Sequence, residues 1–76
     1  MKQKTHLTRA NVLMEAARHI LWNSPEDAIP YGALADLYMR ASADYYEAGH
    51  QEAGEDARKR MVGAQDRLKA NPQPIR

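Results

Sequence analysis

The chain has 76 residues, with 11 Lys and Arg, 10 Asp and Glu, and no cysteine. This length allows one small domain and leaves little room for a deep substrate cleft, so a multidomain enzyme is excluded. The lack of cysteine also excludes disulfide scaffolds, thiolate zinc sites, iron–sulfur clusters and cysteine nucleophiles.

The first predicted element is an amphipathic helix from about residue 8 to residue 22. Its apolar stripe is formed by Ala10, Leu13, Met14, Ala17, Ile20 and Leu21. Asn23 and Pro25 predict its end, because asparagine tolerates a left-handed cap and the residue before a proline avoids helical angles. Residues 1–7 are expected to form a flexible basic arm that precedes a single helical domain over residues 8–71.

A short turn or 3₁₀ segment is predicted at residues 25–28, because Pro30 interrupts the helix opening that starts at Ser24. A second helix is predicted to begin at Pro30. Its apolar residues recur in alternating steps of three and four, which is typical of a helix packed lengthwise against another helix. They are Tyr31, Leu34, Tyr38, Ala41, Tyr45 and Ala48.

Gly49 determines where the second helix is expected to end. A glycine inside a helix costs about 1 kcal/mol, so a cap with a tight reversal at Gly49 is favoured over one unbroken helix across residues 30–70. Gly32 and Gly63 are expected to let helices approach closely. The last helix has a thin stripe of Ala53, Ala57, Met61, Ala64 and Leu68, and residues 72–76 are expected to form a flexible tail.

No segment shows the alternation of a β-strand. The sequence therefore predicts an all-α fold, a small antiparallel helical bundle of about three helices. Its core should be thin, because 13 of its hydrophobic residues are alanine. Chains of this size are commonly stabilised by oligomerisation or by a partner, so we expect a homo-oligomer in which a second copy completes the bundle as a dimer.

No pattern in the sequence indicates an enzyme. Ser24 and Ser42 lie in no nucleophile elbow, and the glycines fall in helical sequence rather than in a phosphate-binding loop. Glu15 and His19 are spaced like two metal ligands, but no second pair accompanies them, so a solvent-exposed pair is favoured. We expect no catalytic activity, no cofactor, no metal and no small-molecule substrate.

The sequence also predicts no association with membranes. No apolar run approaches the roughly 18 residues of a membrane-spanning helix, and the first residues lead into no apolar signal segment. The absence of cysteine fits a cytoplasmic location. No motif assigns the chain to a known family.

Charge is distributed unevenly. Counting Lys and Arg against Asp and Glu gives +3 for residues 1–25, −7 for residues 26–57 and +5 for residues 58–76. An acidic middle thus lies between two basic ends. One interpretation is structural, namely that these charged blocks neutralise one another inside the bundle. Two functional hypotheses are also considered.

The first hypothesis is a small non-enzymatic protein that binds another protein as an adaptor, inhibitor or assembly factor. Exposed aromatic and acidic side chains would make the contact, since Tyr and Trp are enriched at binding hot spots. The candidates are Trp22, Asp36, Asp44, Tyr46 and Glu47. The alternative is a small nucleic-acid-binding protein whose basic ends contact phosphates. Its candidates are Lys2, Lys4, Arg9, Arg58, Lys59 and Arg60.

Overall fold

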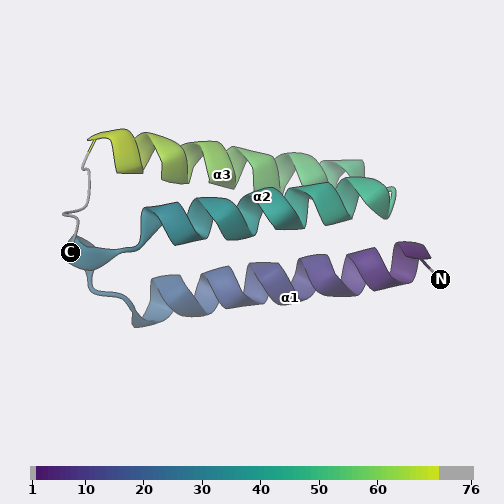
Figure 1. The fold of residues 1–76 in the computed structure, drawn as a ribbon, viewed down its shortest axis with the longest axis horizontal. Coiled ribbons are helices and arrows are strands. Elements are labelled where there is room, and N and C mark those ends of the chain that lie inside the picture. The colour runs from purple at the N-terminus through teal and green to yellow at the C-terminus, as the bar shows by residue number, and fades with distance from the viewer. Residues whose placement is uncertain (1, 71–76) are drawn as a thin grey trace.

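The computed structural model describes residues 2–70, with side chains from residue 4 onward. Helix α1 spans Lys2–Asn23, α2 spans Tyr31–Glu47 and α3 spans Gln51–Ala70, with a short 3₁₀ helix at Glu26–Ala28 (Figure 1). Successive helices run antiparallel, and no strand occurs within residues 2–70, so the predicted all-α fold is confirmed. The predicted tail over residues 72–76 and the side chain of Lys2 lie outside the described residues.

Helix α1 begins earlier than predicted. It starts at Lys2, so residues 2–7 are helical rather than an arm that precedes the helix. Two contacts with α2 accompany the added residues, because Leu7 packs against a core cluster that includes Ala41 and Tyr45, and His6 Nδ1 lies 2.9 Å from Asp44 Oδ1. Both contacts join residues far apart in sequence, and most helical stability in proteins comes from such tertiary packing.

The boundaries of α2 predicted at Pro30 and Gly49 are confirmed. Helix α2 begins directly after Pro30, and Gly49 follows its end with φ of +82°. The N–H of His50 then donates to the carbonyl of Tyr45 at 2.8 Å, which closes the helix terminus. Glycine adopts this left-handed angle without steric cost. The alternative of one unbroken helix over residues 30–70 is therefore wrong.

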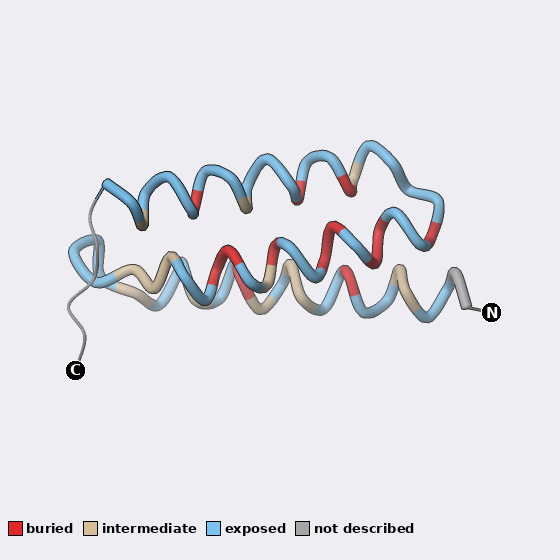
Figure 2. Tube along the Cα trace, turned by 45° about the horizontal axis from the view of Figure 1, so that its top comes forward, coloured by how far each residue is buried: buried red, intermediate tan, exposed pale blue. Residues whose placement is uncertain are grey.

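Helix α2 is the central helix of the bundle. Its predicted seam is buried at Leu34, Tyr38, Ala41, Tyr45 and Ala48, and Tyr31 is half-buried. Figure 2 shows buried residues in red along the central helix. Among the described residues, seven of the ten buried hydrophobic residues are alanine, and Leu34 is the only large side chain that is fully buried. The core is thin, as predicted, and it depends on close approach of the helices.

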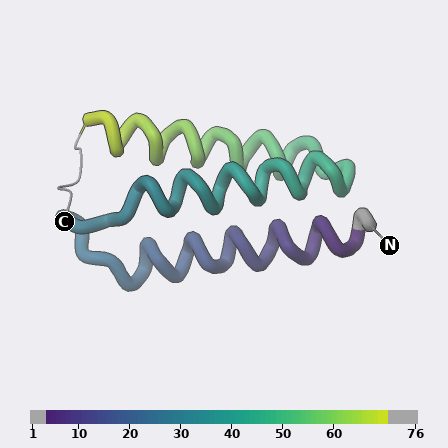
Figure 3. Tube along the Cα trace, viewed as in Figure 1, coloured from purple at the N-terminus to yellow at the C-terminus, as the bar shows by residue number. Residues whose placement is uncertain are grey.

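The two outer helices each pack along α2 but make little contact with each other. Figure 3 shows α2 lying between α1 and α3. The α2–α3 interface is the more extensive of the two. Because α1 and α3 do not close on each other, part of the surface of α2 between them stays open.

Candidate functional site

A groove lies over this open part of α2, near the C-terminal ends of α1 and α3. It forms a hollow of about 410 Å³ that is open to solvent. Its floor consists of Ile29, Tyr31, Leu34 and Tyr38, its α1 rim of Leu21, and its α3 rim of Arg60, Gly63, Ala64 and Arg67. We call this surface the α1–α3 groove. It combines an apolar floor with cationic side chains along one edge.

Leu21 belongs to the predicted apolar stripe of α1, yet 40% of its surface is exposed on the groove rim. The buried members of that stripe, Ala10 and Ala17, pack against α2. Leu21 lies close to the end of α1, on the rim of the open hollow. Its exposure follows from the gap between the outer helices.

Gly63 does not play the packing role predicted for it within the chain. A Cβ built at Gly63 meets no atom within 4 Å, and one at Gly32 makes only an ordinary contact with Leu68 at 3.8 Å. The close approach occurs instead at Gly54, where a Cβ would lie 2.9 Å from the ring of Tyr46. Gly63 thus leaves a bare stretch of backbone on the groove rim.

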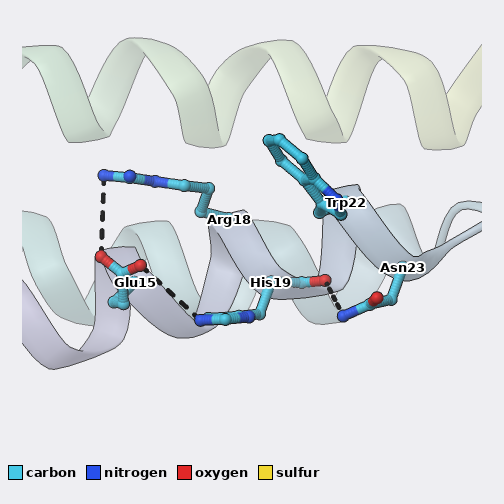
Figure 4. Close-up of a pocket in the computed structure, with 5 residues that line it drawn as sticks. All are labelled: Glu15, Arg18, His19, Trp22 and Asn23. Carbon is cyan, nitrogen blue, oxygen red and sulfur yellow. Dashed lines mark hydrogen bonds and ion pairs between the residues drawn. The ribbon is translucent and has the colours of Figure 1, made fainter.

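Trp22 stands at the C-terminal end of α1 with 83% of its surface exposed. Figure 4 shows its indole ring pointing from α1 toward α3, beside Arg18. The two residues line a shallow hollow together with Glu15, His19 and Asn23. A large aromatic side chain left in water is available for contact with another molecule. Trp22 follows Leu21 of the groove rim in sequence but lines this separate hollow.

Glu15 and His19 form the solvent-exposed pair expected from the sequence. The carboxylate lies 3.7 Å from His19 Nε2 and 3.6 Å from Arg18 Nη2 (Figure 4). Within residues 4–70, no group of three or more His, Asp or Glu side chains is placed to hold a metal ion. None of the helices over residues 2–70 combines the length and apolar character that crossing a bilayer requires.

Asp44 is buried and engaged inside the chain, contrary to the prediction that it faces a partner. Arg9 donates to its two carboxylate oxygens from Nε at 2.9 Å and from Nη2 at 2.8 Å, and His6 Nδ1 lies 2.9 Å from Oδ1. Hydrogen bonding from Arg9 lowers the pKa of the Asp44 carboxyl, and burial opposes this effect. The cluster of His6, Arg9 and Asp44 clamps α1 to α2, and we call it the polar clamp.

The other acidic and aromatic candidates lie on α2. Asp36 is exposed and pairs with Arg40 at 3.2 Å. Tyr46 is 41% exposed, and Glu47 is exposed at the C-terminal end of α2. Because α1 and α2 are antiparallel, this end lies opposite the end of the bundle that carries Trp22 (Figure 1). The structure does not bring these candidates together into one surface.

The basic candidates are also spread over separate surfaces. Lys4 and Arg9 line a hollow on α1, where Arg9 is also occupied by the polar clamp. Arg60 lies on the rim of the α1–α3 groove. Arg58 and Lys59 line a hollow formed by α3 alone. These side chains do not form one continuous basic face.

Comparison with protein-family models, curated proteins and solved structures finds no match to this chain. Function must therefore be argued from its own surfaces. The sequence did not reveal the α1–α3 groove, because its residues come from three segments that only the fold joins. One sequence feature pointed to this surface. Gly63 is a glycine inside the last helix, and it lies outside that helix's apolar stripe.

Proposed function

We propose that this protein acts without catalysis by binding another protein chain in the α1–α3 groove, as an adaptor, inhibitor or assembly factor. The observation that supports the proposal is the hollow that the helices leave open over α2, where Leu21 is 40% exposed and Tyr31 is half-buried, together with the 83% exposed Trp22 next to Leu21 in sequence. Apolar patches rimmed by charged residues are characteristic of protein interaction sites.

The shape of the groove favours a helix as the bound segment. Two helices flank it and a third forms its floor, so a further helix would add to the bundle by the same side-chain packing that holds α1 and α3 on α2. Apolar residues spaced three and four apart on the incoming helix would contact Tyr31 and Tyr38. Trp22 would be buried at the edge of the contact.

The test is capture of a partner by the full chain and by two variants. Trp22→Ser removes the exposed ring beside the groove, and the amount of bound partner should fall about tenfold, as expected when a hot-spot side chain is lost. Val62→Ser is the matched control, because Val62 is 44% exposed on the face of α3 outside the groove. Equal capture by all three chains would contradict the proposal.

The nucleic-acid alternative predicts a different result in parallel gel shifts. Binding would weaken steeply as salt is raised and would be lost when Arg58 and Lys59 are both replaced by alanine. Trp22→Ser would then have no effect. We place this alternative second, because the basic candidates lie on separate surfaces.

A further inference from the structure

We infer that the segment bound in the α1–α3 groove is an acidic amphipathic helix of another protein, with two carboxylates that pair with Arg60 and Arg67. The inference rests on the proposed function and names the chemistry of the bound segment. It is supported by the charge of the groove lining, by the unpaired side chain of Arg67 and by the bare backbone at Gly63.

The groove lining carries charge of one sign. Among the described residues that line it, Arg60 and Arg67 are the only charged ones, and the others are apolar residues, tyrosines and a glycine. A basic helix in the groove would meet like charges. An uncharged helix would take water from the two guanidinium groups without replacing its hydrogen bonds. An acidic helix complements both the apolar floor and the cationic rim.

The two arginines differ in how far the chain itself satisfies them. Arg60 donates from Nε to Asp56 at 3.1 Å, yet 54% of its side chain stays exposed. The side chain of Arg67 is exposed and makes no hydrogen bond or ion pair within residues 4–70. A guanidinium group binds a carboxylate through two parallel hydrogen bonds. Arg67 is therefore the first site for a carboxylate of the partner, and Arg60 is the second.

The spacing of the two arginines fits a helix that lies along α3. Arg60 and Arg67 are seven residues apart on α3, which is two helical turns or about 10 Å. Carboxylates with the same spacing on an incoming helix would reach both guanidinium groups. Apolar residues three and four positions apart on the adjoining stripe of that helix would contact the groove floor.

Gly63 lies between the two arginines, three residues after Arg60 and four before Arg67. These spacings place the three residues on one face of α3. A Cβ added at Gly63 would meet no atom within 4 Å, so folding of the described chain does not require a glycine there, although glycine weakens a helix. The bare backbone lets a bulky apolar side chain of the partner approach α3 closely between the two ion pairs.

The test uses three synthetic helical peptides that differ only in charge. Each has about 18 residues with leucines three and four positions apart, and each carries Glu, Gln or Lys at two positions separated by two helical turns. Fluorescence anisotropy of a dye on the peptide measures binding to the full chain. The Glu peptide should bind about tenfold more tightly than the Gln peptide, and the Lys peptide should bind most weakly. Added salt should reduce these differences, because it screens exposed charges.

Two charge reversals on α3 locate the contact. Arg67→Glu should weaken binding of the Glu peptide about tenfold and should strengthen binding of the Lys peptide, an inversion that loss of structure would not produce. Arg58→Glu makes the same exchange on the face of α3 outside the groove. It is the matched control and should leave the order and the strength of binding unchanged.

A third variant tests the close approach at Gly63. Gly63→Leu fills open space, so the chain should keep its helical content while all three peptides bind at least about tenfold more weakly. Val62→Leu enlarges the neighbouring side chain, which lies outside the groove, and should bind the peptides normally.

Failure of the Glu peptide to bind, or equal binding of the three peptides, would overturn the inference. A charge preference that Arg67→Glu leaves unchanged would do the same. Tighter binding of a single-stranded oligonucleotide than of the Glu peptide, lost in Arg67→Glu, would make nucleic acid the occupant. Loss of peptide binding as the chain is concentrated into a dimer would make a second copy the occupant, and both results would overturn the inference.

The outcomes also separate this inference from the proposed function. Equal binding of the three peptides that is weakened by Gly63→Leu would leave the groove as a protein-binding site without a preference for acidic partners. If no peptide binds but a protein is captured and is lost in Trp22→Ser, the proposed function stands and the inference fails. Without binding of any peptide and without such capture, both fail.

Discussion

The helices α1 and α3 lie on the same central helix through different kinds of contact. Toward α3, the contact depends on small residues, since the ring of Tyr46 covers Gly54 and the hydroxyl of Ser42 donates to the Gly54 carbonyl at 2.9 Å. Toward α1, long polar side chains bridge the helices, with Arg9 hydrogen-bonded to Asp44 at 2.8 and 2.9 Å. Close packing holds α3, and α1 adds a hydrogen-bonded ion pair to the packing of Ala10 and Ala17.

The two outer helices should therefore respond differently to mutation and to pH. Close packing is sensitive to added volume and insensitive to pH, whereas an ion pair is sensitive to the protonation of its carboxylate. Mutations at the α1–α2 interface and at the α2–α3 interface should therefore have distinguishable effects.

The largest effect is expected from Gly54→Leu at the α2–α3 interface. A Cβ at this position already lies 2.9 Å from the ring of Tyr46, so the new side chain must displace the ring and separate the helices. The free energy of unfolding should fall by about 3 kcal/mol, as for other overpacked sites. Urea denaturation followed by circular dichroism measures it.

The matched control is the same exchange at Gly63, where the added side chain meets open space. In dilute solution, Gly63→Leu should leave the free energy of unfolding of the single chain nearly unchanged. If the two variants lost the same stability, close packing would not be what holds α3.

Acid is expected to loosen α1 before α3. Pairing with Arg9 lowers the pKa of the Asp44 carboxyl below its ordinary value of about 4. A lowered pKa in the folded state means that the carboxylate stabilises the fold fully above that ordinary value, and that this stability is lost as the pH falls through the lowered value. Hydrogen exchange at acid pH, corrected for intrinsic rates, should show α1 losing protection first.

Two variants test whether Asp44 is the group responsible. Asp44→Asn should weaken the protection of α1 already at neutral pH and should remove most of its dependence on acid. Asp36→Asn breaks an exposed pair with Arg40 on the same helix and should retain the wild-type profile. Simultaneous loss of protection in α1 and α3 of the wild-type chain would contradict the distinction between the two interfaces.

The features predicted correctly from the sequence are those that local patterns determine. The seam of α2 follows from periodicity, and its end at Gly49 follows from a backbone angle that glycine adopts freely. The early start of α1 is accompanied by the contact of His6 with Asp44, which lies 38 residues away. Composition cannot separate a buried, paired carboxylate from an exposed one, so the charge pattern predicts Asp44 at the surface with its acidic neighbours.

The smallest effects are expected when either of two hydroxyl groups on α2 is removed. The hydroxyl of Tyr45 donates to Asn11 Oδ1 of α1 at 2.8 Å, and that of Ser42 donates to the carbonyl of Gly54 in α3. Tyr45→Phe should cost about 1 kcal/mol, because it removes one of the few polar bridges to α1. Ser42→Ala should cost roughly half of that, since the Gly54 carbonyl keeps its helical hydrogen bond.

The location of the loss is as informative as its size. Hydrogen exchange in Tyr45→Phe should accelerate in α1 and not in α3, because the contact of Tyr46 with Gly54 is untouched. In Ser42→Ala, α3 should retain its protection for the same reason. An acceleration of hydrogen exchange in α3 of Ser42→Ala as large as that in α1 of Tyr45→Phe would contradict the contrast between close packing at α3 and polar bridging at α1.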